Sequence, residues 1–289
     1  MRAYLQALGF QRVLALRPAS CGLESENATL WLCLWGYQAS EPADPVLGEI
    51  HPYYPASQRA YEAARQAVAE GERRGLHLRQ DTELRLKPLF AHLQGFAQGR
   101  NTLSSVEGIG SRFHVQALWM REAAEAYEDG LWEEHPHGLA CGACRACLAA
   151  CPTGALDAEG FHREKCLRNW MLSSHPVPEE LRRAMGNLLV GCDACQRCCP
   201  RNAGLPVTAG TGVALERMLR EPKEAARVFA PQIGFNLAIP NRILGQALLA
   251  AGNSGDPSVL PLVKNWVQHP SEAVREHAQW AAAQLEETP

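Results

Sequence analysis

The sequence lacks three features that would each indicate a broad class of protein. Its 289 residues contain no apolar run of roughly 18 residues, so we expect no transmembrane helix and no membrane partner. The opening stretch MRAYLQALGFQRVLAL has no apolar region followed by a small-residue cleavage site, so we expect a cytoplasmic location. The net charge is −3, which does not indicate a strongly basic nucleic-acid binder.

Cysteine, in contrast, is abundant. Cys21 and Cys33 stand alone near the start, and the other nine of the 11 cysteines lie between positions 141 and 199. Because a chain without an export signal is not expected to carry a disulfide scaffold, crowded cysteines indicate metal binding. We expect Cys21 and Cys33 to be core residues, since an isolated cysteine packs as a small hydrophobe.

The crowded cysteines form two runs. The first is Cys141-x2-Cys144-x2-Cys147-x3-Cys151-Pro, the second is Cys192-x2-Cys195-x3-Cys199-Pro, and Cys166 lies between them. In ferredoxins with two [4Fe–4S] clusters, the cysteine before the proline ligates the cluster of the other run. This rule predicts a ferredoxin-like module with one cluster on Cys141, Cys144, Cys147 and Cys199, and a second on Cys151, Cys166, Cys192 and Cys195.

Zinc is the alternative metal for clustered cysteines. A four-thiolate zinc site usually pairs two Cys-x2-Cys knuckles and does not call for three cysteines followed by Cys-Pro, so the pattern favours iron–sulfur clusters. We leave Cys198, which neighbours Cys199, out of the ligand sets as a spare or buried thiol. Two close clusters would transfer electrons one at a time, and the rest of the chain must then bind what they reduce.

Composition and periodicity divide the chain into three predicted domains, 1–130, 131–205 and 206–289. The first is predicted to be α/β or α+β, the second is the cysteine-rich module, and the third is helical. In the first, helices are predicted at 2–9, 57–74 and 83–98, and strands at 10–16, 29–37 and 76–80, with 113–120 a strand or the start of a helix. In the third, helices are predicted at 242–251, 258–268 and 272–285, with Asp256 and Ser271 as N-caps. Short helices joined by Pro/Gly turns resemble HEAT-type repeats.

Both cysteine runs resemble one known family. The segments CGACRACLAACPTGAL, CLRNW and GCDACQRCCPRN, the preceding KPLFAHLQGFAQGRNTLSSVEGIGSRF, the strand LWLCLWGY and the terminal ALLAAGNSGDPSVLPLV are similar to those of the epoxyqueuosine reductases. These are cobalamin-dependent enzymes of tRNA queuosine biosynthesis. The resemblance implies an oxidoreductase with an N-terminal α/β cobalamin-binding domain, the double [4Fe–4S] module and a HEAT-like helical end, in all an α+β multi-domain fold.

The resemblance also implies cofactors and partners. The clusters would pass electrons to cobalamin from a donor such as flavodoxin or ferredoxin, and the protein would act on tRNA as a monomer. The predicted contacts to the corrin are Gly99, Arg100, Asn101, Gly110 and Ser111. Family members bind cobalamin without a histidine below the cobalt, so we treat His51, His77, His92 and His114 as surface or core residues.

The family's catalytic acid is an aspartate eight residues before the proline that matches Pro88. Counting without a gap reaches Gln80, and a one-residue deletion would give the role to Asp81, with Glu83 as a further candidate. An acid must reach the proton acceptor on the substrate, so the position matters. The alternative for Asp81 is a structural role as the N-cap of the helix that follows it.

Charge leaves the substrate open. The segment 208–289 carries seven Lys/Arg and eight Asp/Glu, whereas a tRNA-binding surface should be basic. A local basic group of Arg182, Arg183, Arg197 and Arg201 lies near the cysteines, and solvated surface charge explains it equally well. Two alternatives to the tRNA reductase therefore remain: a cobalamin-binding reductase of a small molecule, and an electron-transfer protein without cobalamin.

Overall fold

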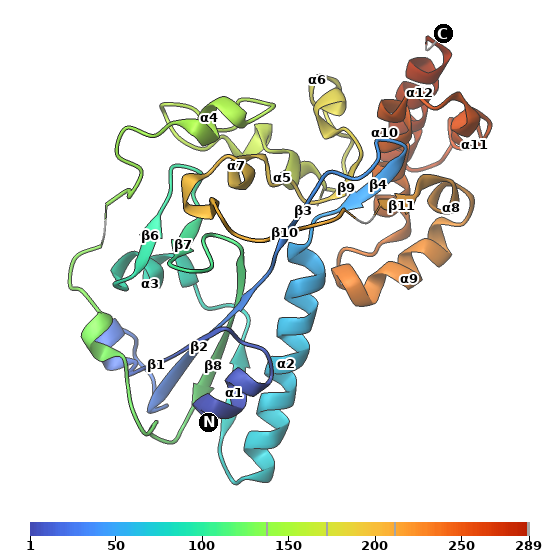
Figure 1. Cartoon of the computed structure of the whole chain (residues 1–289). Helices are drawn as coiled ribbons and strands as arrows, with labels where there is room; N and C mark the ends of the chain where they lie inside the picture. The colour runs from blue at the N-terminus through green and yellow to red at the C-terminus, as the bar shows by residue number, and fades with distance from the viewer. Residues whose placement is uncertain (137, 172, 211, 288–289) are drawn as a thin grey trace. The chain divides into compact units, whose positions relative to one another are not determined.

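The computed structural model describes residues 1–136, 138–171, 173–210 and 212–287 (Figure 1). The chain divides into two compact units, each assembled from separate stretches. Unit 1 consists of Met1–Gln38, Ala56–Ala146 and Cys198–Leu205, and unit 2 consists of Ala39–Pro55, Cys147–Arg197 and Pro206–Pro289. These units do not follow the three sequence domains, which remain a prediction.

Unit 1 is built on a four-stranded sheet with the order β1-β2-β8-β5. Its strands are β1 (Arg12–Leu16), β2 (Thr29–Gly36), β5 (Leu78–Asp81) and β8 (Phe113–Met120). All three pairings are antiparallel, so of the two predicted alternatives, α/β and α+β, this part is α+β. The segment at 113–120 is a strand, which pairs with β2 along its full length.

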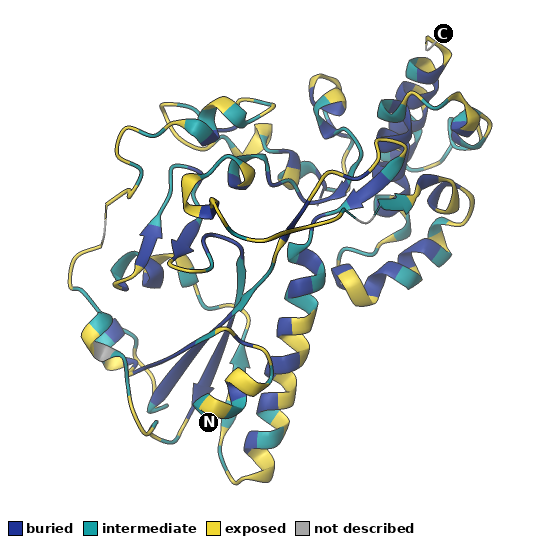
Figure 2. Ribbon diagram, in the orientation of Figure 1, coloured by how far each residue is buried: buried dark blue, intermediate teal, exposed yellow. Residues whose placement is uncertain are grey.

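Residues on both faces of this sheet are buried, and its strands are largely dark blue in Figure 2. One face packs on α1 (Arg2–Ala7) and on the alanines of α2 (Tyr53–Arg73), and includes Trp31 and Cys33. The other face, with Cys21 beside it, packs on α3 (Leu86–His92) and on the hairpin of β6 (Phe96–Gln98) and β7 (Ser104–Val106). Cys21 and Cys33 are therefore core residues, as predicted.

Two helix predictions in this region need correction. The helix predicted at 57–74 begins earlier, at Tyr53, because Pro55 is tolerated in a first turn and Tyr54 is buried. The helix predicted over 83–98 covers only Leu86–His92. It ends there because Gly95 takes a left-handed φ of 78° and Phe96 turns back to pair with Val106, stacking its ring 4.7 Å from that of Phe90.

Unit 2 contains two small sheets that the sequence did not predict. One has the strand order β11-β4-β9, with β4 (Leu47–Ile50), β9 (Leu188–Val190) and β11 (Gly212–Ala214). The other pairs β3 (Ala39–Ser40) with β10 (Val207–Thr208). Each sheet joins the stretch 39–50 to strands that lie more than a hundred positions further along the chain.

Most helices of unit 2 contribute to one large core. The helices of the cysteine-rich part are α4 (Ala146–Ala150), α5 (Leu167–Met171), α6 (Glu179–Arg182) and α7 (Ala194–Arg197). The C-terminal ones are α8 (Leu215–Arg220), α9 (Pro222–Ile233), α10 (Pro240–Ser254), α11 (Leu260–Lys264) and α12 (Glu272–Glu286). The core includes residues of α5, α6 and α8 to α12, but not of α4 and α7.

The predicted C-terminal helices and caps are partly confirmed. The helix predicted at 258–268 is shorter, because a 3-10 turn over Pro257–Val259 precedes α11. Asp256 caps that turn as predicted, accepting a hydrogen bond of 2.9 Å from the Ser258 N–H. Ser271 occupies the N-cap position of α12, but its side chain makes no capping bond. The HEAT-type classification stays a prediction.

His277 connects the cysteine-rich stretch of unit 2 to its C-terminal helices. Its Nε2 accepts a hydrogen bond of 2.9 Å from the Val177 N–H, and its Nδ1 lies 3.1 Å from the Gly245 carbonyl. The side chain is 2% exposed. Burial lowers the pKa of His277 to about 4, and the charge of Arg182 acts in the same direction, against the Gly245 hydrogen bond. The folded protein therefore holds this imidazole neutral.

This depressed pKa predicts a loss of stability in mild acid. The unfolded chain takes up a proton near pH 6.5 and the folded chain only near pH 4, so the free energy of unfolding falls as the pH drops between these values. From pH 7 to pH 5 the contribution of His277 is a loss of about 2 kcal/mol. Urea unfolding should show a shallower pH slope for His277→Gln than for wild type. The exposed His175, replaced in the same way, is the control, and an unchanged slope in His277→Gln would contradict the prediction.

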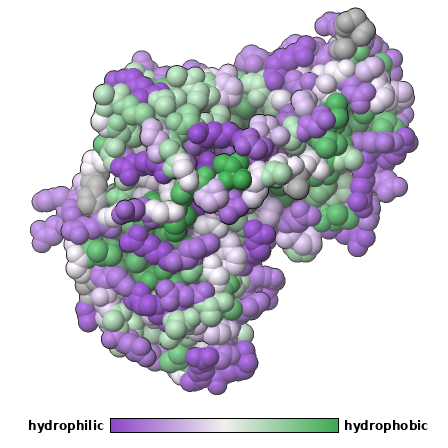
Figure 3. All heavy atoms as spheres, in the orientation of Figure 1, coloured by the Kyte–Doolittle hydropathy of each residue, from purple (hydrophilic) through white to green (hydrophobic). Residues whose placement is uncertain are grey.

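Among the described residues, no helix is long and apolar enough to cross a membrane. The face drawn in Figure 3 intersperses hydrophilic and hydrophobic side chains.

Candidate iron–sulfur and substrate site

Three of the four cysteines predicted to hold the second cluster influence one another electrostatically in unit 2. Burial raises the pKa of Cys192 to about 11, and the neighbouring charges of Asp193, Cys166 and Cys151 add to the rise, against a lowering hydrogen bond from the Ala194 N–H. Thiols that repel each other's charge in this way are favourable ligands for a cation, because the metal removes the repulsion. The fourth predicted ligand, Cys195, lies one turn further along, in α7.

The loop after Cys151 wraps around its sulfur. Burial alone would raise the pKa of Cys151, but the N–H groups of Thr153, Ala155 and Leu156 lower it below its ordinary value. The Thr153 hydroxyl oxygen lies 3.7 Å from the same sulfur, and its hydrogen is donated over 2.7 Å to the Lys165 carbonyl, one residue before Cys166. The loop thus stabilises a thiolate at Cys151 and ties it to the segment that carries Cys166, which fits a cluster ligand.

A network of ion pairs and hydrogen bonds holds the segment that carries Cys192 and Cys195. The Asp193 carboxylate lies 2.7 Å from Arg197 Nε and 3.5 Å from His51 Nε2. Arg197 also donates to the Ser40 carbonyl at 2.8 Å and lies 3.4 Å from the Glu49 carboxylate. Burial raises the pKa of Asp193, but the hydrogen bonds and charges of His51 and Arg197 hold it below its ordinary value. Sequence reasoning missed this network because Ser40, Glu49 and His51 lie more than 140 positions before Asp193 and Arg197.

In unit 1, Arg100, one of the residues predicted to contact a corrin, contacts the first cysteine segment. The Arg100 N–H donates to Cys141 Sγ at 3.3 Å, and its guanidinium donates to the Gly142 carbonyl at 2.9 Å. Asn101 accepts from the Leu103 N–H, and Gly99 opens the same turn. An N–H directed at a ligand sulfur stabilises the thiolate and raises the reduction potential of its cluster.

Gly110 and Ser111 pack on the residue three places after Cys199. The Ser111 N–H donates to Asn202 Oδ1 at 2.8 Å, and Asn202 returns a 3.0 Å bond to the Ser111 hydroxyl. Gly110 has a φ of 62°, and a Cβ there would overlap Asn202 and the Arg201 carbonyl. Glycine is therefore required for this close approach. The structure places all five predicted corrin residues in loops that support the cysteines, and the corrin contact itself stays a prediction.

Unit 1 also contains a large open cavity of about 580 Å³ beside the β6–β7 hairpin. Its lining includes Phe96, Ala97, Ser105, Gly108, Ala140 and Arg201. Ala140 directly precedes Cys141, and Arg201 lies two residues after Cys199 and 3.5 Å from the Ala140 carbonyl. Phe96, Ala97, Ser105 and Gly108 lie in the segment that resembles the family before the cysteines, but no sequence pattern indicated that they line a cavity.

Asp81 ends β5, next to the sheet of unit 1. Its carboxylate accepts hydrogen bonds of 2.8 Å from Trp119 Nε1, 2.8 Å from the Glu83 N–H and 3.0 Å from the Leu84 N–H. Burial raises the pKa of Asp81, but these bonds and the charge of Arg79 outweigh it and lower the pKa below its ordinary value. Since α3 begins only at Leu86, Asp81 holds a turn and is not the N-cap of that helix. Glu83 is exposed.

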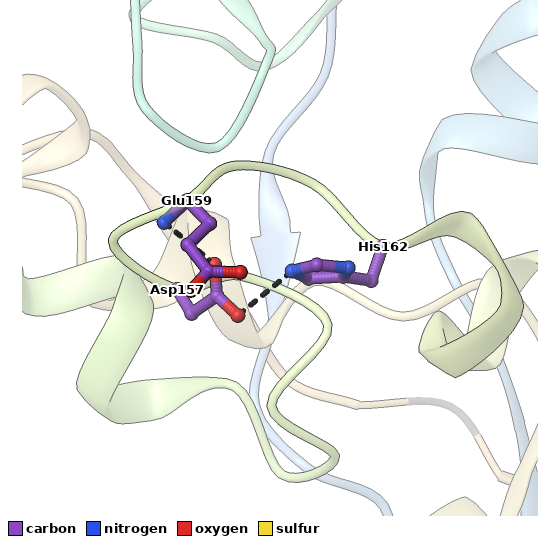
Figure 4. A group of neighbouring side chains, drawn as sticks. All are labelled: Asp157, Glu159 and His162. Atoms are coloured by element: carbon purple, nitrogen blue, oxygen red, sulfur yellow. Dashed lines mark hydrogen bonds and ion pairs between the residues drawn. The ribbon is translucent and has the colours of Figure 1, made fainter.

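Three side chains gather in the turn between the cysteine runs (Figure 4). Asp157 accepts from the N–H groups of Glu159 and Gly160 at 2.8 and 3.0 Å, and His162 Nε2 lies 2.7 Å from its carboxylate. The geometry of the turn accounts for all of these contacts. We assign no metal to them.

Two of the four predicted basic-patch arginines are engaged inside unit 2. Arg182 is 7% exposed, donates to the Val177 carbonyl and pairs with Glu276 at 2.8 Å. Arg197 holds the network described above. Arg183 is exposed and lies 5.8 Å from the ring of Trp280. Because Arg182 and Arg197 pair with carboxylates, the basic group has less positive charge available for binding a nucleic acid than its sequence suggests.

The histidines considered at the sequence level contact protein groups. His51 lies beside Asp193, and His77 Nδ1 lies 2.6 Å from the Glu122 carboxylate. His92 stacks on Trp132 with ring centroids 4.8 Å apart. Burial lowers the pKa of His114 to about 4.

Comparison with known proteins identifies the relationship. A family model described as a 4Fe-4S double cluster binding domain matches residues 140–202. An epoxyqueuosine reductase from Pseudomonas aeruginosa is 31% identical over 203 residues, which cover 66% of this chain and 54% of the relative. The chain is a relative of the epoxyqueuosine reductases. It spans about half the length of that curated relative.

Solved structures extend the likeness of this epoxyqueuosine reductase relative to the whole fold. The structure of epoxyqueuosine reductase from Streptococcus thermophilus matches with a TM-score of 0.73 and 17% identity, over 100% of this chain and 90% of that one. A crystal structure of epoxyqueuosine reductase with a tRNA-Tyr epoxyqueuosine-modified stem loop matches with a TM-score of 0.70 and 17% identity, over 98% and 88%. The resemblance seen in the sequence and the double-cluster module are confirmed.

Proposed function

We propose that the chain is an iron–sulfur oxidoreductase that reduces epoxyqueuosine in tRNA, with cobalamin as a further cofactor. The observation that carries the proposal is the fold, which matches epoxyqueuosine reductases over its full length, including one with a modified tRNA stem loop. The matched double-cluster domain supplies the means of electron transfer.

The cluster ligands proposed are those of the Cys-Pro rule. For the second cluster, the proposal is supported by the mutual influence of Cys192, Cys166 and Cys151 and by the N–H groups around Cys151. For the first cluster, the support is the cysteine spacing and the N–H of Arg100 directed at Cys141.

Three features of the cavity of unit 1 support cobalamin binding there. The cavity is open, its glycines Gly108 and Gly138 leave free space where a Cβ would stand, and two of its residues adjoin cluster cysteines. Bound there, cobalamin would supply a cobalt ion that accepts electrons from the clusters and reacts with the epoxide. Phe96, Ala97 and Ser105 would hold it by packing and hydrogen bonding, and Arg201 would meet its polar edge.

Asp81 is the proposed source of the proton for the oxygen that the epoxide releases. At rest the Trp119 indole and two backbone N–H groups stabilise its charged form. It must therefore take up a proton before it can act. A reductase of a small molecule is the second candidate, favoured by the net charge of −3 and by the pairing of Arg182 and Arg197.

Two successive experiments test the proposal: the first measures cobalamin binding, and the second measures reduction of epoxyqueuosine in a stem loop. Cobalamin added anaerobically to the reduced, cluster-loaded protein should bind and change its visible spectrum, and the complex should convert an epoxyqueuosine-containing stem loop to the queuosine form. Failure to bind cobalamin would leave the electron-transfer protein as the function. Binding without reduction of the stem loop would favour the small-molecule reductase. The donor, the monomeric state and the cytoplasmic location stay predictions.

A further inference from the structure

A second cavity, of about 200 Å³, lies within unit 2 and plays no part in the proposed reaction. Its lining includes Ser173, His175, Asn241, Arg242, Gln246 and Ser271. Ligand pockets for drug-sized molecules begin at roughly 300 Å³, so the occupant of this one is small.

Two helices of 15 residues begin at this cavity. α10 starts at Pro240 behind the N-cap Ile239, and α12 starts at Glu272 behind the N-cap Ser271. Neither N-cap side chain makes a capping hydrogen bond. The first-turn N–H groups of a helix lack intrahelical partners and carry the positive end of its dipole. In α10, Pro240 has no N–H and the Arg242 N–H donates to the Ile239 carbonyl at 2.9 Å, so the Asn241 N–H is the donor that this first turn offers. The cavity therefore receives two positive helix ends that no side chain caps, with most of the N–H donors on α12.

Buried polar atoms in the lining lack protein partners. Gln246 is 4% exposed and its Oε1 has no hydrogen-bond partner among the described residues. The Nε of Arg242 is also buried without one, although its Nη1 donates to the Asn236 carbonyl at 3.0 Å. The two ends of a glutamine amide can exchange places, so Gln246 can present either a donor or an acceptor. Unpaired buried groups of this kind are costly and indicate a ligand.

The charge of the lining is positive. Arg242 carries a permanent charge, whereas no described lining residue is acidic. Glu272, in the first turn of α12, is exposed and does not line the cavity. His277 reaches the wall, but Val177 and Gly245 engage both of its ring nitrogens. An anion with several acceptor oxygens matches this arrangement better than a cation or an apolar group.

We propose that this cavity binds a phosphate group, held by the guanidinium of Arg242, the amide of Gln246, the Asn241 N–H of α10 and the first-turn N–H groups of α12. The hydroxyls of Ser173 and Ser271 complete the donors. The phosphate belongs either to a small phosphorylated molecule or to an RNA backbone. Both would present the same phosphate oxygens to these donors.

Titration calorimetry of the cluster-loaded full chain with inorganic phosphate tests this site. Arg242→Met should weaken phosphate binding roughly tenfold or more, since it removes a charged donor. Ser271→Asp should abolish binding, because its carboxylate occupies the end of α12 and repels the anion. Aspartate is a strong N-cap, so this variant should keep or raise the melting temperature, which separates lost binding from misfolding. Arg227→Met, at an exposed arginine that pairs with Glu224, is the matched control and should bind as wild type does.

The result that overturns the site is phosphate binding of equal strength in all four proteins, or none to wild type at about 10 mM phosphate. If binding is as expected, an RNA stem loop that displaces the phosphate identifies the RNA backbone as its source. A stem loop that leaves the phosphate bound identifies a small molecule. Iron content should be the same in every variant, so the outcome is independent of the proposed reaction.

Discussion

Replacing Cys166 with alanine should halve the iron content of the purified protein, from about eight to about four atoms per chain. Cys166 is the ligand that the second cysteine run lacks, and its charge acts on Cys192 together with that of Cys151. With only three thiolates left, the second cluster should not be retained, while the first keeps all four proposed ligands. Iron and acid-labile sulfide analysis, together with the EPR spectrum of the reduced protein, would measure the loss.

Two other cysteines provide matched controls. Cys198→Ala should retain about eight iron atoms, because Cys198 is outside both proposed ligand sets. Cys21→Ala removes a core thiol and should lower stability without changing the iron content. If Cys198→Ala loses a cluster while Cys166→Ala keeps both, the ligand assignment of the second run is wrong.

Replacing Asp81 with asparagine should slow reduction of the epoxyqueuosine stem loop by about 10²–10⁴-fold, the usual contribution of a positioned acid or base. Iron content and cobalamin binding should not change. Single-turnover kinetics with the cobalamin-loaded protein would measure the rate. The matched control is Glu83→Gln, which changes the other candidate acid. A large loss of rate in Glu83→Gln together with a normal rate in Asp81→Asn would make Glu83, and not Asp81, the proton donor.

Trp119→Phe separates a proton donor from a structural aspartate. Removing the indole N–H takes away a bond that lowers the pKa of Asp81, so that pKa should rise. An acid acts in its protonated form, and activity is lost as the pH rises through its pKa. The alkaline limb of the pH–rate profile should therefore move to higher pH in Trp119→Phe. A profile that stays in place would mean that Asp81 only holds its turn.

The parts of the fold that could be predicted from the sequence are those with strong local patterns. A continuous apolar run located β2, and cysteine spacing located the cluster module, because these signals are local. The segment of β8 was left open between a strand and the start of a helix, because His114 and Gln116 interrupt its apolar residues. The stretch 39–50 could not be predicted, because its short strands β3 and β4 exist only by pairing with remote segments. The Asp193 network and the contact between Ser111 and Asn202 were missed for the same reason.

The site residues show the same limit. Arg100 and Ser111 were predicted to contact a corrin, and no sequence pattern indicated that they would contact Cys141 and Asn202. Arg182 and Arg197 were interpreted as surface charge, because their carboxylate partners Glu276 and Glu49 lie far away in sequence.

The interleaved units have a consequence for how the chain folds as it is synthesised. Unit 1 is not complete until Cys198–Leu205 has been made, and β4 of unit 2 must wait for β9. Until then, the apolar faces and strand edges of the segments synthesised first remain exposed and can associate with other nascent chains. Closing loops of such length makes folding slow, because the entropy is lost before the long-range contacts form. We therefore expect a strong need for chaperones, and assembly of the clusters only after most of the chain has emerged.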